Sequence, residues 1–342
     1  MYKKVIEDIK RNLGPNNDLN RKYLISQIDI YKTHENSTEI VKEISRMIWE
    51  CLTPEEQEEF VRIIEEENPI KEILIEAEFY IQNNDYETAL EKLDGFMKSS
   101  SEFYENDEIN EYHSFPNPLE ELIFNEYIGC KKEIKYIPED QPLEDLFFAY
   151  GFLLRNASRL DEAENSLKEA LRINPVSTRT ILELCDIYKM RTPTFNKFYF
   201  YNMDALKYAY SGDDLARIYN NLGFFYYEEN NTELSLACYK YSLKYENNPF
   251  TKSKIEYLER NSGIELNEET CIELLKSKHI QLGAKPFIIE NLEKLAIEYE
   301  KDTLFNQALF FYRLLYSVKK EENTFKKIKE LDLKTRRMKR KI

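Results

Sequence analysis

Apolar side chains along most of this chain recur at the spacing of one face of an α-helix. In the stretch from 216 to 249, a first helix carries four residues at positions i, i+3, i+4 and i+7, namely Tyr219, Leu222, Gly223 and Tyr226. A polar turn follows, and Ser235, Tyr239 and Ser242 then mark a second helix. Small residues stand where two helix backbones must approach closely, and aromatic residues fill the space beside them. The pattern predicts a helical hairpin that stacks on copies of itself.

The same pattern occurs earlier in the chain with a fixed spacing. A first helix is indicated by Phe147, Tyr150, Gly151 and Leu154, a second by Ala163, Leu167 and Ala170, and the next first helix by Ile181, Leu184, Cys185 and Tyr188. Gly151 and Cys185 are 34 residues apart, and Asn174-Pro175 closes the unit between them. This spacing, with its small residues and closing proline, resembles the tetratricopeptide repeat (TPR). We therefore read Cys185 as a packing residue on a buried face.

The resemblance implies an all-α fold, a right-handed superhelix of TPR-like helical hairpins with an irregular N-terminal cap and one insertion. The expected segments are an acidic helical cap of degenerate repeats at 1–68, a TPR-like hairpin at 69–98, an irregular insertion with one helix at 99–142, a TPR-like array at 143–318 and a basic C-terminal tail at 319–342. The array includes a weaker hairpin at 251–278 and a last clear unit opened by Pro286.

Local start signals refine these boundaries. In the N-terminal segment Ile40, Ile44 and Met47 form an apolar helical face. Thr53 followed by proline and then an acid three residues after the threonine predicts a helix at 54–67. In the insertion, Asn117-Pro118 predicts a helix at 118–128, and the segment 134–138 is expected to be extended.

Composition excludes several classes of protein. Only 8 glycines accompany 25 tyrosines and 20 phenylalanines, which disfavours a glycine-rich phosphate loop. The 5 cysteines are scattered without the spacing of a disulfide framework or a metal site. The start of the chain lacks the apolar core of a signal peptide, and no apolar run reaches membrane-spanning length. These features indicate a cytoplasmic protein.

Charge is distributed unevenly. Residues 1–143 contain 33 acidic and 16 basic residues, whereas the remainder is close to neutral. An acidic surface repels nucleic acid and favours basic or apolar partners. The basic end, residues 334–342, could instead contact the phosphates of RNA.

Catalysis has few candidates in this sequence. The 3 histidines, at 34, 113 and 279, lie in no recognisable motif, so we assign no catalytic residue, metal ligand or cofactor. In the resembled family, the first helix of each hairpin lines a groove that holds a peptide or a helix of a partner. The corresponding concave-face residues here are Phe148, Phe152, Arg179, Arg217, Asn220, Asn221 and Phe224.

These residues combine aromatic anchors with Arg and Asn, a mixture that suits peptide recognition. Phe148 and Phe152 replace the first basic and amide residues of the clamp with which some members of the family hold a terminal carboxylate. The sequence therefore predicts a non-catalytic scaffold for a protein or peptide whose identity it does not define, as it does not define the oligomeric state. Three alternatives stay open: a peptide-responsive regulator of a signalling protein, an RNA-associated protein that uses the basic tail, and an enzyme with its chemistry in the insertion.

Overall fold

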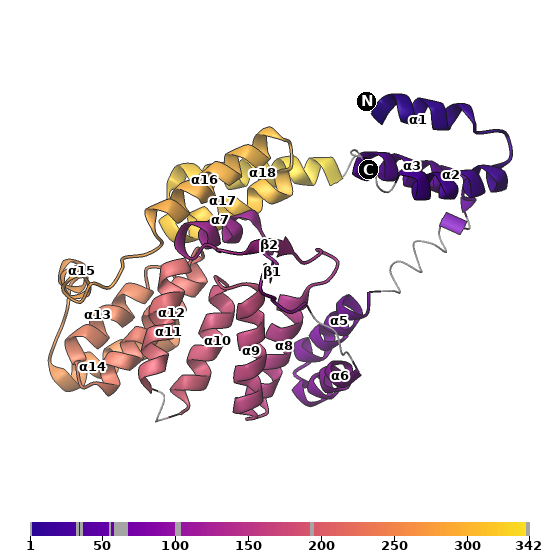
Figure 1. The fold of residues 1–342 in the computed structure, drawn as a ribbon. Coiled ribbons are helices and arrows are strands. Elements are labelled where there is room, and N and C mark those ends of the chain that lie inside the picture. The colour runs from indigo at the N-terminus through magenta and orange to yellow at the C-terminus, as the bar shows by residue number, and fades with distance from the viewer. Residues whose placement is uncertain are drawn as a thin grey trace. The chain divides into compact units, whose positions relative to one another are not determined.

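The computed structural model describes residues 2–31, 34, 37–54, 56–57, 68–99, 104–191 and 195–339. The chain divides into two compact units, one on each side of the Glu72–Ile73 bond. Both are built from helices that pack against their neighbours in sequence (Figure 1). Apart from one pair of short strands, all the regular elements of the described residues are helices, as the apolar pattern predicts.

The first unit has its own small core. It contains α1 (Tyr2–Arg11), α2 (Asn17–Tyr31) and α3 (Ser37–Glu50), and α3 packs against both of the others. Ile40, Ile44 and Met47 on α3 are buried with Ile9 and Leu24, so the predicted apolar face is confirmed.

The helix predicted at 54–67 lies mostly outside the described residues, but its start is present. The Thr53 amide donates to Glu56 Oε2 at 2.8 Å, and the Glu56 amide donates to Thr53 Oγ1 at 3.2 Å. These reciprocal bonds form the predicted capping box.

The second unit contains most of the chain, and its boundary falls within its first helix. Its elements are α5 (Pro69–Gln82), α6 (Tyr86–Ser99), β1 (Asn110–His113), α7 (Pro118–Tyr127), β2 (Glu133–Tyr136), α8 (Leu143–Asn156), α9 (Leu160–Ile173), α10 (Thr178–Lys189), α11 (Phe195–Tyr208), α12 (Gly212–Glu228), α13 (Thr232–Ser242), α14 (Pro249–Ser262), α15 (Glu268–Ser277), α16 (Pro286–Lys301), α17 (Phe305–Lys319) and α18 (Glu322–Lys339). Helices α8 and α9, α10 and α11, α12 and α13, and α16 and α17 pack as consecutive pairs.

Four hairpins turn with the same backbone geometry. In the turns after α5, α8, α12 and α16, the second of three connecting residues has a left-handed backbone, with φ of 59°, 61°, 58° and 62° at Asn84, Ser158, Asn230 and Thr303. The amide of the next residue then donates to the carbonyl oxygen five residues earlier, at 2.8 to 2.9 Å in all four turns. These bonds satisfy carbonyls at the end of the first helix. The repetition is therefore present in the backbone as well as in the sequence.

The small residues stand at close helix crossings, as the pattern predicts. A Cβ atom added to Gly223 would lie 2.7 Å from Tyr239 Cδ1, and one added to Gly151 would lie 2.7 Å from Leu167 Cγ. Cys185 is fully buried in the same way between α10 and α11. Burial raises the pKa of the Cys185 thiol, which agrees with a packing role.

The insertion covers one end of the helical array. Asn117 caps α7 as expected, and the extended segment pairs as β2 in parallel with β1, a strand that the sequence analysis did not predict. Ile123 and Phe124 of α7 join the main core. Figure 1 shows α7 with the two strands at the ends of α8 to α12, so the insertion lies at an end of these helices.

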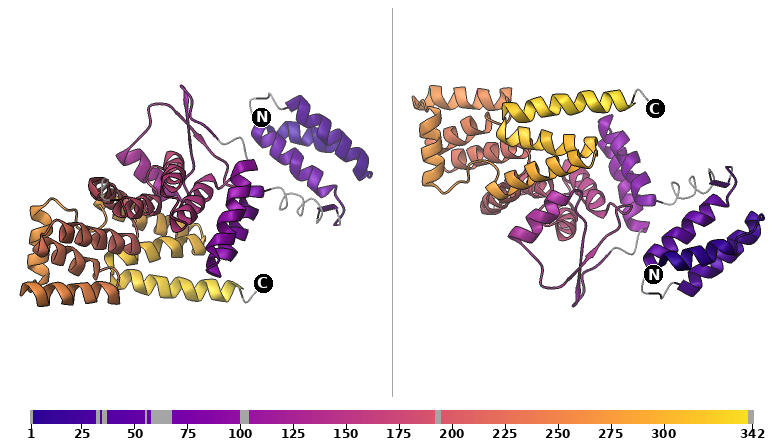
Figure 2. Two further views of the ribbon diagram at one scale, coloured as in Figure 1. Left: turned by 90° about the horizontal axis from the view of Figure 1, so that it is seen from below. Right: turned by 90° about the horizontal axis from the view of Figure 1, so that it is seen from above.

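The C-terminal helices pack on the ends of the same array. Helix α17 contacts α12, where the Gly212 amide donates to Ser317 Oγ at 2.9 Å, and α16 contacts α7. Residues 319–339, which the sequence analysis assigns to a basic tail, contain α18, and Ile328 and Leu331 of this helix are buried. In Figure 2, α18 lies along α17.

The weaker hairpin predicted at 251–278 differs in its packing. Helices α14 and α15 are both present, but α15 packs chiefly against α13. Its Cys271 and Leu275 enter the main core, while Ile255 and Leu258 of α14 pack with Leu236 and Tyr239 of α13. Both helices therefore cover α13.

None of the helices in the described part of the chain has the length and apolar character that crossing a membrane requires.

Candidate functional site

The seven residues predicted to bind a peptide all lie on the first helices of successive hairpins. Phe148 and Phe152 are on α8, Arg179 is on α10, and the other four are on α12. Side-chain contacts connect α8 to α10, α10 to α12 and α12 to α14. We call the surface along these four helices the first-helix row, and it includes Phe148, Phe152, Arg179, Arg217, Asn220 and Phe224. The contacts also show which of the side chains are already occupied.

Arg179 connects α10 to α8. Its guanidinium pairs with both Glu144 and Asp145, and its Cζ atom lies 4.5 Å from the centre of the Phe148 ring. Glu144 is buried and also accepts hydrogen bonds from the hydroxyls of Ser177 and Thr180, at 2.9 and 3.0 Å. Arg179 therefore neutralises a buried carboxylate between two helices.

Arg217 makes the equivalent connection from α12 to α10. Its Nη2 atom lies 2.9 Å from a carboxylate oxygen of Glu183 and 2.9 Å from one of Asp186. Glu183 is buried and also pairs with Arg155 of α8 at 2.9 Å, while Arg155 lies over the Phe152 ring. The carboxylate of Glu183 thus holds three first helices together.

The two asparagines have different surroundings although they are neighbours in sequence. Asn220 accepts a hydrogen bond from Thr251 Oγ1 of α14 at 2.7 Å and so extends the first-helix row. Asn221 is buried and donates to Asn202 Oδ1 of α11 at 3.1 Å. Because adjacent residues point in different directions around a helix, Asn221 faces the second helices of the array. Its contacts are those of a packing residue.

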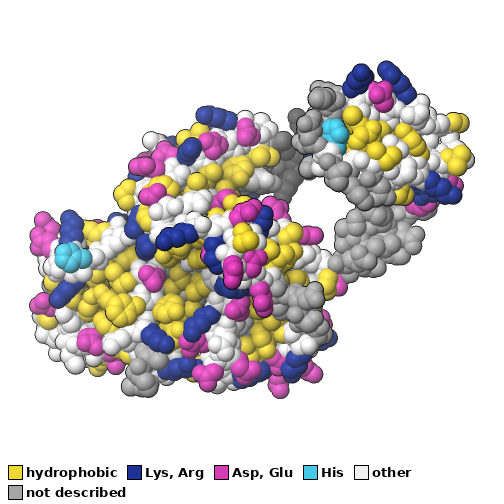
Figure 3. Space-filling model, in the orientation of Figure 1, with side chains coloured by type: hydrophobic (Ala, Val, Ile, Leu, Met, Phe, Trp, Pro, Cys, Tyr) yellow, Lys and Arg dark blue, Asp and Glu magenta, His cyan; other side chains and the backbone are white. Residues whose placement is uncertain are grey.

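Phe224 lies beside a pocket of about 440 Å³ that opens between α10, α12, α13 and α14. We call it the lysine pocket, and its lining residues are Lys189, Phe224, Tyr227, Tyr239, Phe250, Lys254, Tyr257 and Leu258. Lys189 Nζ stands 4.1 Å from the centre of the Phe224 ring, and Lys254 Nζ stands 4.7 Å from that of Phe250. Figure 3 shows apolar side chains gathered over this part of the second unit with Lys and Arg side chains among them.

The two lysines of the pocket lack the carboxylate partners that the arginines have. Among the described residues, neither Lys189 nor Lys254 forms an ion pair, whereas Lys92, Lys168, Lys240 and Lys327 each do. Burial lowers the pKa of Lys189, and burial together with the nearby charge of Lys189 lowers the pKa of Lys254. The charge of Lys189 therefore disfavours the charged form of Lys254, whereas the nearby carboxylate of Asp186 favours the charged form of Lys189.

Another hollow, of about 480 Å³, lies beside Cys271 and includes Lys240. That lysine is already paired with Glu259 and donates to the Leu266 carbonyl. The lysine pocket is the better candidate because its lining is mostly aromatic and because, among the described residues, neither of its two lysines forms an ion pair.

Sequence reasoning missed both lysines. Arg179, near the start of α10, is the residue of this helix that was predicted to bind a peptide. Lys189 lies in the last turn of the same helix, three residues after Asp186. Lys254 belongs to the hairpin with the weakest pattern, whose α14 nonetheless continues the first-helix row. The available signal was the helical spacing of Lys189 from Arg179 and Asp186 on one face.

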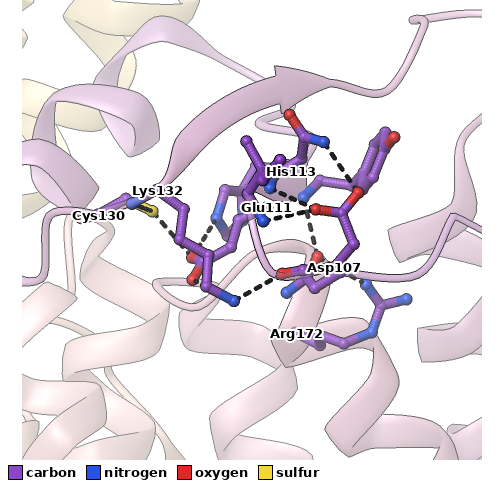
Figure 4. Close-up of polar contacts among 10 residues, drawn as sticks. Asp107, Glu111, His113, Cys130, Lys132 and Arg172 are labelled. Atoms are coloured by element: carbon purple, nitrogen blue, oxygen red, sulfur yellow. Dashed lines mark hydrogen bonds and ion pairs between the residues drawn. The ribbon is translucent and has the colours of Figure 1, made fainter.

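The insertion contains a second cluster of polar residues (Figure 4). Glu111 stands at its centre: Cys130 Sγ donates to Glu111 Oε2 at 3.0 Å, and His113 Nε2 lies 3.5 Å from the same oxygen. Lys132 Nζ donates to the Asp107 carbonyl at 2.8 Å. His113 is only 2% exposed, and its Nδ1 lies 3.0 Å from the carbonyl oxygen of Ile173.

This cluster lacks the features of a nucleophilic site. The hydrogen bond to Glu111 raises the pKa of the Cys130 thiol, so the thiolate required for nucleophilic attack is disfavoured. Glu111, His113 and Asp107 instead join the loop before β1 to β2 and to the end of α9. No group of three side chains in the described ranges is arranged to hold a metal ion.

Comparisons with known proteins do not assign the chain to a family. No family model matches it, and no curated protein matches it either.

Proposed function

We propose that this protein is a non-catalytic scaffold that binds a protein or peptide along the first-helix row. In this proposal the hairpins are TPR-like and stack in a right-handed superhelix whose concave face presents the row. The observation that carries the proposal is the lysine pocket, where aromatic side chains meet, at one end of the row, two lysines that form no ion pair with any described carboxylate. Concave, mostly apolar sites with a few polar groups are typical binding sites.

The four identical turns and the close crossings at Gly151 and Gly223 support the TPR-like part of the proposal. Scattered cysteines, all present as free thiols, favour a reducing compartment such as the cytoplasm. Of the basic end on which the RNA alternative rests, Lys334 pairs with Glu330, and residues 340–342 lie outside the described residues.

Selection of a displayed peptide library against the full chain tests the proposal. Two rim aromatics, Phe250 and Tyr257, are 70% and 58% exposed, so replacing both by serine should leave the fold intact. Phe200, which is 65% exposed on α11, provides a matched control outside the pocket. We expect enriched peptides to bind the wild type and Phe200→Ser, and to lose binding to the Phe250→Ser/Tyr257→Ser variant.

Failure to enrich any peptide would contradict the proposal. Enriched peptides that bind the double variant as well as the wild type would move the site away from the pocket. Retention of short RNA that depends on residues 334–339 would favour the RNA alternative instead.

A further inference from the structure

The lysine pocket also indicates the chemistry of its occupant, and this inference rests on the proposed function. We propose that the pocket binds an internal peptide segment in which an aspartate or glutamate stands next to an aromatic or aliphatic residue. The carboxylate lies between Lys189 and Lys254, and the apolar side chain packs on the aromatic wall that includes Phe224 and Tyr239.

Charge is the first argument for an acidic occupant. Arg217 pairs with Asp186, the nearest acidic residue on α10, and so this carboxylate is already engaged. Lys189 and Lys254 remain as two positive groups in partly apolar surroundings, each over an aromatic ring. A carboxylate placed between them would relieve their mutual repulsion and form charged hydrogen bonds. The structure therefore has charge complementarity for an anion at this point.

Shape and surface type are the second argument. Six of the eight lining residues are aromatic or aliphatic, and the rim residues Phe250 and Tyr257 are mostly exposed. A small anion alone would leave this surface in contact with water, whereas an apolar side chain beside the carboxylate would cover it. The occupant therefore needs both an acidic and an apolar group within one or two residues.

The type of cation favours a carboxylate over a phosphate group. Arginine presents a planar fork that suits bidentate binding of phosphate, but Arg179 and Arg217 are both engaged with carboxylates of the protein. The mostly apolar lining of the pocket favours an anion carried beside an apolar side chain over a free phosphate group.

The first-helix row leads away from the pocket, so a segment that enters the pocket has chain that can contact the neighbouring helices. Asn220 and Thr251 join α12 to α14 beside it, and the row extends from there through Arg217 toward α8. A peptide that places one acidic residue in the pocket can therefore continue along neighbouring helices.

The test uses arrays of short peptides with varied flanks, amidated C-termini and one of three cores: Phe-Asp, Phe-Asn or Ser-Asp. Binding to the full chain is measured by fluorescence polarisation. We expect the Phe-Asp peptides to bind at least about tenfold more tightly than either other set. The Phe-Asn peptides lose charged hydrogen bonds, each of which is worth more than a factor of about ten. The Ser-Asp peptides lose the burial of an aromatic side chain, which is worth a similar factor. A fourth set, Phe at a free C-terminus, tests whether a terminal carboxylate replaces the acidic side chain.

Variants assign any binding to the pocket. The Lys189→Gln/Lys254→Gln protein should lose the preference for Phe-Asp over Phe-Asn. The control is Lys252→Gln, which changes an exposed lysine on α14, the helix of Lys254, and should retain the preference. Melting curves show whether each variant is folded.

The inference fails if Phe-Asn binds as well as Phe-Asp, if the terminal carboxylate binds best, or if the double variant keeps the preference. In those cases the proposed function still stands provided that the library selection yields peptides dependent on Phe250 and Tyr257. If the library selection yields no such peptides and the Phe-Asp preference is also absent, both the proposed function and this inference are wrong.

Discussion

Two regions of the first-helix row use similar residues in opposite ways. Between α8 and α12, Arg179 and Arg217 meet the buried carboxylates of Glu144 and Glu183 and hold helices together. At the lysine pocket, Lys189 of α10 and Lys254 of α14 meet aromatic rings, and among the described residues neither forms an ion pair with a carboxylate. The difference shows that a cation on a repeat face can serve either packing or binding. A cation beside a buried carboxylate, such as Arg179 beside Glu144, serves packing, whereas a cation beside aromatic rings is available for binding.

The largest expected loss of stability comes from a substitution at the close crossing of α12 and α13, beside the lysine pocket. In Gly223→Leu the new side chain would overlap the Tyr239 ring, which is buried and lines the lysine pocket. We expect a loss of about 3 kcal/mol or more in the free energy of unfolding, measured by denaturant titration. Gly95→Leu is the control, because no heavy atom lies within 4 Å of its added Cβ. Equal stability of the two variants would contradict the close crossing.

A second substitution concerns a buried carboxyl group near Glu144, the buried partner of Arg179. Glu120 of α7 is buried, accepts hydrogen bonds from Asn174 and Tyr210, and lies near Glu144. Burial raises the pKa of Glu120 from 4.5 to about 7. The folded state therefore binds the proton more tightly than the unfolded state, and this contribution to stability is complete below pH 4.5 and is lost as the pH rises toward 7.

Glu120→Gln removes that titration while keeping a group of similar shape. Relative to wild type, the variant should gain up to about 3 kcal/mol between pH 4.5 and 8. Glu126→Gln, an exposed residue on the same helix, should show no such trend. Parallel stability curves for wild type and Glu120→Gln would show that the carboxyl does not titrate in this range.

Arg217→Ala tests the paired region directly and should have a smaller effect. It would leave Asp186 without its guanidinium and Glu183 with Arg155 alone. The side chain of Arg217 is 36% exposed, so solvent reduces the cost to about 1 to 2 kcal/mol. This expectation replaces the one suggested by the sequence, in which Arg217 is an exposed peptide ligand. An unchanged melting temperature would restore that earlier interpretation.

The sequence predicted the helical pairs well because small and large residues alternate at fixed spacing. Gly151 and Gly223 mark crossings that the structure shows as close contacts, and Asn117 marks the start of α7. It could not predict the engagement of Arg179 and Arg217, because their carboxylate partners lie on the preceding first helix, 31 to 35 residues away along the chain. The packing of α17 against α12 depends on still more distant contacts, such as that between Gly212 and Ser317.

The candidate site was predictable in part. The first helices and Phe224 were assigned from the spacing together with the resemblance to the tetratricopeptide repeat, while Asn221 faces the second helices. Lys189 and Lys254 lie on different first helices, and their proximity depends on how α14 packs against α13. Local patterns do not specify such packing where a repeat is irregular.

The smallest expected effect on stability comes from the pocket lysines, and its sign distinguishes the two regions. Burial lowers the pKa of Lys189 and Lys254, so below the folded-state pKa the folded protein carries the full cost of holding two charges. That cost decreases as the pH rises toward the ordinary lysine value of 10.5, because the folded state then releases protons before the unfolded state does. Lys189→Met/Lys254→Met should therefore be equally or slightly more stable than wild type at neutral pH, by less than about 1 kcal/mol. The advantage should shrink in alkaline buffer while peptide binding is lost at every pH. A marked loss of stability in this variant would mean that the lysines, like the arginines, hold the helices together, and the contrast between the two regions would disappear.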